Sequence, residues 1–252
     1  MTVHPTLLTE SVRLTAFLTP GTQLGEPTWW SDLTGNQPET KTAKPSLNEL
    51  QVIGPFGDRQ LVLSAQLGRV DWLLTPKPSQ SFEEPHQIAS IGQFPESFAS
   101  FEPLMVRWLA VPVPIIRLAF GAVVLQSVDQ AAAGYRRLAE LLPSVQIDPV
   151  GSRDFFYQIN RPRASTFIRD LRLNRLSKWN VVLFQRVQFG VSIPAPQVIN
   201  SQAGNKLTAT RIEVDVSTPE DSTAELPSEG RGDLFRELAN LGSEIIRRGD
   251  VA

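Results

Sequence analysis

The sequence predicts an α+β fold with a mainly antiparallel sheet, a few packed helices and a C-terminal helix on an acidic tether. Several segments alternate apolar and polar residues with the period of a half-buried strand, and others carry apolar residues at helical spacing. Strands and helices do not follow one another in regular βαβ order. The chain of 252 residues has 41% hydrophobic and 20% charged residues, an ordinary globular composition. A chain of this size can bury a full core.

The first expected elements are a strand and a short helix. Residues 11–19 alternate and stop at a Pro-Gly pair, which is typical of a half-buried strand that ends in a turn. Residues 27–33 begin with proline and are followed by Gly35, which favours a short helix. The polar, proline-bounded stretch 38–45 is expected to be a surface loop.

The middle of the chain is expected to supply a hairpin, a helix and a strand. Residues 61–74 alternate around Gly68, which predicts a hairpin or one long bulged strand. Residues 95–108 carry apolar side chains at spacings of three and four, with a kink or a restart expected at Pro103. Residues 116–124 alternate again and predict a strand with a strongly buried face.

The clearest helical pattern covers residues 129–142, with Asp129 as the expected N-cap and a proline as the stop. Aromatic and β-branched residues predict strands over 154–159 and 180–193. Residues 206–217 form a last alternating strand, with acidic and basic residues on one face and aliphatic residues on the other.

Three consecutive parts are expected along the chain. Residues 1–217 form a single α+β domain, residues 218–232 an acidic linker rich in Pro and Ser, and residues 233–249 a helix. Asp233 is the expected N-cap of this helix, and Gly249 follows its end. The helix either docks on its own sheet, which we favour, or reaches a neighbouring chain.

Composition and motifs exclude several classes of function. The chain contains no cysteine, which excludes disulfides, a thiol nucleophile and Cys-ligated metals. It contains no phosphate-binding glycine loop and no Gly-x-Ser-x-Gly elbow, so we expect no cofactor and no catalysis. The first ten residues do not resemble a secretory signal, and no apolar run is long enough to span a membrane. We therefore expect a cytoplasmic protein without a membrane partner.

One cluster could hold a metal ion. Glu83, Glu84 and His86 are close in sequence and could form part of the site of a metal-dependent hydrolase. A solvated loop explains the same residues, because a single histidine in a polar loop is weak evidence for a site, and zinc sites need four ligands when structural and three when catalytic. We therefore predict no metal site and keep the hydrolase as an alternative hypothesis.

The most unusual segment is residues 153–186, which holds eight Lys and Arg against two Asp, with aromatic residues between them. Basic side chains over aromatic platforms suit single-stranded nucleic acid. The C-terminal residues 213–250 carry ten carboxylates and four Arg, so the two segments could instead pair with each other, within one chain or between two. If the basic segment binds a partner, the expected binding residues are Arg161, Arg163, Arg172, Arg175, Lys178 and Trp179.

A further feature is the adjacent pair Trp29 and Trp30. Neighbours on a helix or strand do not face the same core, so one of them is either an exposed interface anchor or covered by another element. The leading hypothesis from the sequence is a non-catalytic intracellular protein that binds another protein or associates with itself. A nucleic-acid-binding module that uses residues 153–186 is the alternative.

Overall fold

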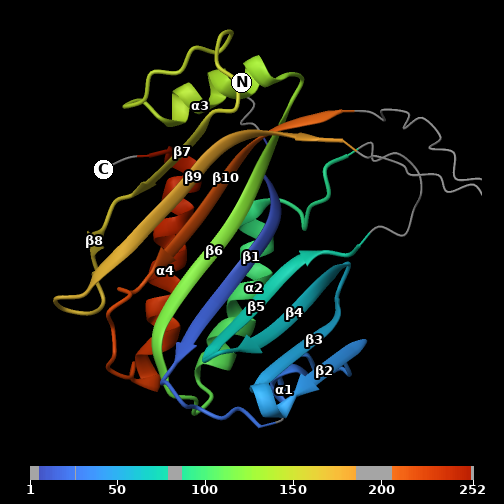
Figure 1. Cartoon of the computed structure of the whole chain (residues 1–252), viewed down its shortest axis with the longest axis vertical. Helices are drawn as coiled ribbons and strands as arrows, with labels where there is room; N and C mark the ends of the chain where they lie inside the picture. Colours follow the sequence, from blue (N-terminus) through green and yellow to red (C-terminus); the bar gives the residue numbers. More distant parts are fainter. Residues whose placement is uncertain (1–5, 26, 79–86, 186–205, 251–252) are drawn as a thin grey trace, which may run out of the picture.

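A computed structural model describes residues 6–25, 27–78, 87–185 and 206–250. One antiparallel sheet of ten strands runs through this part of the chain, and four helices pack against it (Figure 1). The α+β fold with a large antiparallel sheet and a C-terminal helix, which the sequence predicts, is therefore confirmed.

Two long strands form the middle of the sheet. β1 (Leu8–Leu18) and β6 (Ile115–Val128) pair with each other. β5 (Arg69–Pro76) flanks β1, and β10 (Leu207–Ser217) flanks β6. These four strands carry most residues of the candidate site described below.

The remaining strands extend the sheet toward its two edges. Beyond β5 lie β4 (Arg59–Gln66), β3 (Glu49–Phe56) and β2 (Thr40–Lys44). Beyond β10 lie β9 (Arg172–Phe184), β7 (Phe156–Asn160) and the short β8 (Arg163–Ala164), which also pairs with β9. The full order is β2-β3-β4-β5-β1-β6-β10-β9-β7.

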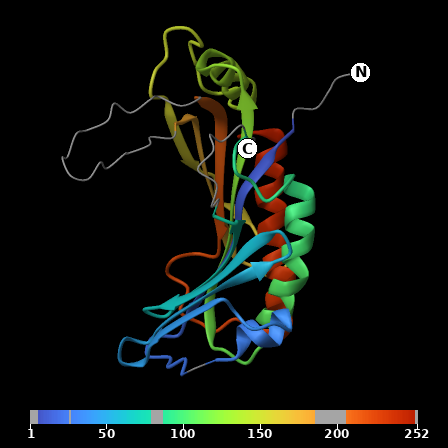
Figure 2. The same cartoon turned by 90° about the vertical axis from the view of Figure 1, so that its right-hand side faces the viewer.

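The helices of the described chain lie on one face of the sheet. They are α1 (Trp29–Thr34), α2 (Phe94–Leu109), α3 (Ala131–Leu141) and α4 (Ser228–Arg248), with a 3₁₀ turn at Pro45–Leu47. In the side view of Figure 2, the sheet curves so that α2 and α4 lie on its convex side. We call the other, concave side the open face.

Two halves of the chain follow the same path through the sheet. In each half the chain starts in a central strand (β1 or β6) and continues at an edge of the sheet (β2 or β7). The following strands then lead back toward the centre, and the last of them (β5 or β10) lies next to the central strand. Each half then finishes with a long helix, α2 or α4, and these two helices pack together. The sheet therefore has an approximate two-fold arrangement about the β1–β6 pair, and β5 and β10 occupy equivalent places.

The core lies between the sheet and the helices. One row of directly opposite residues crosses five strands, and every member is fully buried: Leu63, Trp72, Leu14, Phe120 and Val216. Burying one large apolar side chain stabilises a fold by roughly 1.5–3 kcal/mol. The alternation seen in the sequence therefore separates a helix-facing core from the open face, which is polar at its centre. A small buried apolar cluster of Ile88, Leu125 and Ala209 lies where β6 ends and β10 begins.

Several elements appear where the sequence predicts them. The short helix α1 ends at Gly35, whose φ of 71° is the left-handed conformation that favours glycine. The hairpin β4–β5 turns at Leu67 and Gly68, both with positive φ. The two adjacent tryptophans are both buried, because Trp29 packs edge-on against Trp108 and Trp30 stacks on Trp72. The exposed-anchor alternative for this pair is therefore wrong.

Several strands differ from the sequence prediction, which contains neither β3 nor the short β8. Residues 40–44 form strand β2 instead of a loop. All five residues of β2 are exposed at the sheet edge, so the strand has no apolar face that a periodicity could reveal. β9 starts at Arg172, eight positions before the predicted strand, because the buried positions Arg175 and Ser177 break the apolar alternation. The end of the predicted strand 180–193 lies outside the described residues.

Two helix starts also differ. Gln130 precedes α3 at the N-cap, one position after the predicted Asp129. α4 begins at Ser228, so the last part of the expected linker is helical and Asp233 is not a cap. The earlier start follows from Arg231, which is 2% exposed and donates to backbone carbonyls of the neighbouring segments. The helix docks on its own sheet, as we favoured.

Candidate binding surface on the open face

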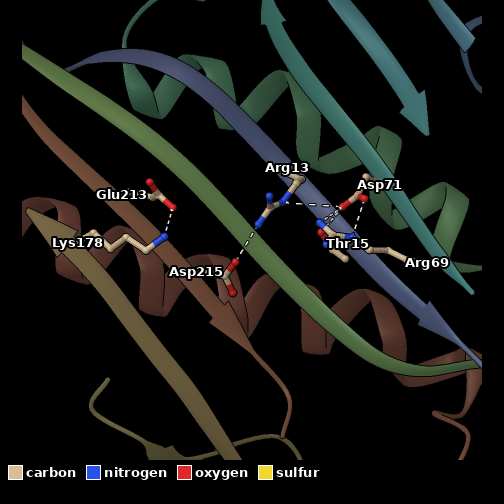
Figure 3. Close-up of polar contacts among 7 residues, drawn as sticks. All are labelled: Arg13, Thr15, Arg69, Asp71, Lys178, Glu213 and Asp215. Atoms are coloured by element: carbon tan, nitrogen blue, oxygen red, sulfur yellow. Dashed lines mark hydrogen bonds and ion pairs between the residues drawn. The ribbon is translucent and has the colours of Figure 1, made fainter. Parts of the chain in front are cut away.

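The centre of the open face holds a guanidinium that bridges three strands. Arg13 on β1, Gly121 on β6 and Asp215 on β10 are successive cross-strand neighbours. Nη2 of Arg13 donates to Oδ2 of Asp215 at 2.8 Å, so the side chain passes over β6 (Figure 3). A Cβ atom at position 121 would lie 3.1 Å from this nitrogen. Glycine therefore leaves the space that the guanidinium occupies.

Asp71 on β5 is a second carboxylate at this centre. Its Oδ1 accepts hydrogen bonds from Oγ1 of Thr15 at 2.5 Å and from Nη2 of Arg69 at 2.8 Å. Nε of Arg13 lies 4.0 Å from the same oxygen. Arg13 therefore lies between two carboxylates that come from equivalent strands of the two halves (Figure 3).

Further ion pairs continue toward β9. Nζ of Lys178 and Nη1 of Arg211 each lie 2.8 Å from a different oxygen of Glu213. Nε of Arg211 also lies 3.4 Å from Oε2 of Glu10, next to the start of the central strand. The open face thus carries a connected band of paired charges across β9, β10 and β1.

An aromatic ring lies near the other end of β1. Phe17 on β1 is flanked across the strands by Arg69 and Arg117. The guanidinium carbons of Arg117 and Arg69 lie 4.3 Å and 5.7 Å from the centre of the Phe17 ring, within cation–π range. Two cations of the open face are therefore also held by an aromatic side chain.

The two neighbouring carboxylates on β10 have pKa values shifted in opposite directions. Burial raises the pKa of Asp215 above its ordinary value, although Arg13 opposes this rise. Burial also acts on Glu213, but hydrogen bonds from Lys178 and Arg211 outweigh it and lower the pKa of Glu213. The environment of Glu213 therefore favours its ionised form, whereas that of Asp215 favours its protonated form.

The six residues expected to bind a partner do not form one surface. By strand alternation Arg172 and Lys178 point to the open face, Arg175 and Trp179 point under the helices, and Arg161 and Arg163 contact the end of α4. Trp179 is completely buried, and its Nε1 donates to Oγ of Ser177 at 2.9 Å. It offers no platform for a nucleic-acid base, and binding by the other five stays a prediction.

The basic and acidic segments pair within one chain. Arg161 holds Asp250 with two bonds, Nε to Oδ1 at 2.6 Å and Nη2 to Oδ2 at 2.8 Å. Hydrogen bonding to Arg161 lowers the pKa of Asp250, against the opposing effect of burial. Arg163 donates to Glu244 at 2.8 Å, and Arg175 lies 3.6 Å from the same carboxylate. Three arginines of the basic segment therefore connect the C-terminal end of α4 to the sheet.

Arg13, Asp71 and Asp215 carry no pattern in the sequence that marks them as a group. Arg13 and Asp215 are 202 positions apart, and each lies in an ordinary alternating strand. The alternation of β10 does place its charged residues on one face. Only the order and register of the strands bring that face together with β1 and β5.

The candidate metal ligands Glu83, Glu84 and His86 lie outside the described residues. Within the described part of the chain, no three His, Asp or Glu side chains gather as metal ligands would. The metal-dependent hydrolase therefore remains an alternative hypothesis from the sequence.

The fold and its open face define an α+β protein whose large antiparallel sheet carries helices on one side. Comparisons with protein-family models, with curated proteins and with solved structures find no match to this chain. Among the helices of the described chain, none has the length and apolarity that crossing a bilayer requires.

Proposed function

We propose that this protein is a non-catalytic binding protein, and that another protein docks on its open face. The observation that carries the proposal is the one-sided construction of the sheet. The described helices all cover the face of the core, and the centre of the open face carries polar and charged side chains held in fixed positions by one another. A preorganised surface loses less conformational entropy when a partner binds.

The pairing of charges favours a protein over nucleic acid. Arg13, Lys178 and Arg211 are each bonded to a carboxylate of the same face. A phosphate backbone would have to compete with these carboxylates for every cation, whereas a mixed polar surface of a protein can complement both signs. Among the aromatic residues of segment 153–186, Trp179 is buried, whereas Phe156 and Phe167 are exposed. We therefore keep nucleic acid as an outcome of the test.

The two edges of the sheet are less suitable for a partner than its face. At one edge, β2 carries Lys41 and Lys44 on a strand of only five residues. At the other edge, β7 also has five residues, and Pro162 follows before β8. Short strands, edge lysines and prolines hinder the addition of another strand. The open face is therefore the surface that we assign to the partner.

Site-specific photo-crosslinking tests this proposal. A photoreactive amino acid replaces Gln51 or Gln158, two exposed residues of the open face on opposite halves of the sheet. The control position is Arg136, an exposed residue on α3. In cells of the native host, we expect both open-face positions to form the same protein adduct, resistant to nuclease and absent from the control. Adducts that nuclease removes, or adducts at Arg136 alone, would contradict the proposal.

A further inference from the structure

A second candidate site lies on the helix-bearing side of the molecule. A groove of about 760 Å³ runs between α4 and residues 163–167, which belong to β8 and the turn after it. This volume is within the range of about 300–1,000 Å³ that ligand sites occupy. Residues of α4 from Asp233 to Arg248 form the other wall. The groove is separate from the open face, which is the opposite side of the sheet.

One wall of the groove is fixed by Glu237. Its carboxylate accepts hydrogen bonds from Oγ of Ser165 and from both the backbone N–H and Oγ1 of Thr166. The next residue, Phe167, remains 47% exposed, and it lies in the groove lining together with Leu241 of α4. The groove therefore has a preformed wall and an accessible apolar patch.

The end of the groove toward the C-terminus of α4 has too few carboxylates for its cations. Three guanidinium groups share the single carboxylate of Glu244: Arg163 at 2.8 Å, Arg248 at 3.4 Å and Arg175 at 3.6 Å. Arg247 also lines the groove, and its Nε donates to the carbonyl of Ser243 at 3.3 Å. Because one negative charge faces several positive charges, this end of the groove attracts an additional anion.

The buried Arg175 adds to the positive potential at this end of the groove. Its side chain is 2% exposed, and its Nε and Nη2 have no hydrogen-bond partner among the described atoms. A buried charge is screened less by solvent than an exposed one, so it contributes more to the local potential. Burial and, to a lesser extent, the nearby Arg163 lower the pKa of Arg175, against the opposing effects of Glu244 and Asp250.

We propose that this groove binds an acidic peptide segment of a partner protein, with a carboxylate at the arginines around Glu244 and an apolar side chain against Phe167 and Leu241. Planar guanidinium groups bind carboxylates with two parallel hydrogen bonds. The groove is open along the helix, and its lining contains both charged and apolar groups, as a peptide with charged and apolar side chains would require. This inference stands apart from the open-face proposal, because it uses none of the same residues.

A labelled peptide tests the groove directly. The probe is the fluorescein-labelled peptide Glu-Glu-Phe-Glu-Glu, and its binding to the full chain is measured by fluorescence anisotropy at low salt. We expect saturable binding that weakens as salt is added. The charge-reversed pair R247E/R248E should raise the Kd about tenfold or more, which corresponds to about 1.4 kcal/mol. Replacing glutamates of the probe by glutamine, or its phenylalanine by alanine, should each weaken binding.

The matched control is the pair R136E/R153E, which makes the same change of net charge at two exposed residues outside the groove. We expect its Kd to stay within about twofold of the parent. Circular dichroism and urea unfolding check that both variants fold. No binding of the probe to the parent, or an equal loss in the control pair, would overturn the proposal. Displacement of the probe by a single-stranded oligonucleotide that binds more tightly through Arg247 and Arg248 would overturn it as well.

Discussion

Nη2 of Arg13 donates a hydrogen bond to Oδ2 of Asp215 at 2.8 Å, from β1 across the whole width of β6 to β10. The two residues belong to different halves of the sheet, and the residue that separates them, Gly121, carries no side chain. The bond therefore depends on a glycine that is far from both partners in the sequence. Together with Asp71 of β5, it ties the two equivalent flanking strands to a single guanidinium.

Adding a methyl group at Gly121 should disturb this bond. The new Cβ atom would lie 3.1 Å from Nη2 and 3.3 Å from Nε of Arg13, so the guanidinium must move. We expect Gly121→Ala to lower the free energy of unfolding by up to about 1 kcal/mol, because the shift loosens the partly exposed ion pair of Arg13 with Asp215. Urea unfolding measures the change. In an Arg13→Met background the cost should largely disappear, and an equal cost in both backgrounds would contradict this explanation.

Gly242 tests how tightly α4 is seated. A Cβ atom there would lie 2.8 Å from Cε1 of Phe120, whose ring is fully buried. Alanine improves helix propensity by about 1 kcal/mol, so packing and propensity oppose each other. We expect packing to dominate in Gly242→Ala, with a net loss of about 1–3 kcal/mol in unfolding free energy.

Gly230 of the same helix is the control for that change. A Cβ atom there would lie 3.2 Å from the ring of Phe167, which is 47% exposed and can move aside. Gly230→Ala should therefore leave the unfolding free energy unchanged or raise it by up to about 1 kcal/mol. Equal losses in the two alanine variants would show that the ring of Phe120 is not the cause.

The core face of the sheet could be predicted from the sequence because it depends on local alternation. Val214 and Val216 of β10 are buried as their spacing indicates, and Glu213 and Asp215 lie on the open face. The limits of this approach appear at β2, where every residue is exposed, and at β9, where the charged Arg175 is buried. In both cases tertiary contacts determine the structure, and the sequence lacks the apolar alternation that would predict it.

The candidate sites could be predicted far less well. A local excess of basic residues over 153–186 is visible in the sequence, but its pairing with Glu244 and Asp250 depends on where α4 docks. Trp179 occupies a strand position like any aromatic core residue, so its burial depends on which face the helices cover. Strand order and helix docking, which local patterns do not encode, decide which charges remain available.

Arg175 and Arg161 should respond differently to the same substitution. Arg175 shares Glu244 with two other arginines, and its Nε and Nη2 have no hydrogen-bond partner among the described residues, so Arg175→Met removes a costly buried charge. We expect its unfolding free energy to change by less than about 1 kcal/mol, or to rise. Arg161→Met leaves the 3% exposed carboxylate of Asp250 without its guanidinium and should cost about 1–3 kcal/mol, a range kept low because Arg161 is partly exposed. A larger loss for Arg175→Met would contradict this assignment.

The contact between Arg161 and Asp250 should make stability depend on pH in a defined direction. Hydrogen bonding to Arg161 lowers the pKa of Asp250 in the folded chain. The unfolded chain has the ordinary value of about 3.9, so the folded state favours the ionised carboxylate. Its contribution is complete above that pH and is lost as the pH falls through the lower folded-state pKa. Asp250→Asn should therefore be less stable than the parent near neutral pH, by about 1–3 kcal/mol in unfolding free energy.

This difference between the parent and Asp250→Asn should shrink as both are unfolded with urea at successively lower pH. Once Asp250 is protonated, its side chain no longer carries the charge that Arg161 binds, so the two proteins become alike at this position. A matched control is Asp221→Asn, which changes an exposed carboxylate in the segment before α4 and should give a difference near zero throughout. A difference for Asp250→Asn that stays constant down to acidic pH would show that the hydrogen bonds of the carboxylate, and not its charge, hold the end of α4.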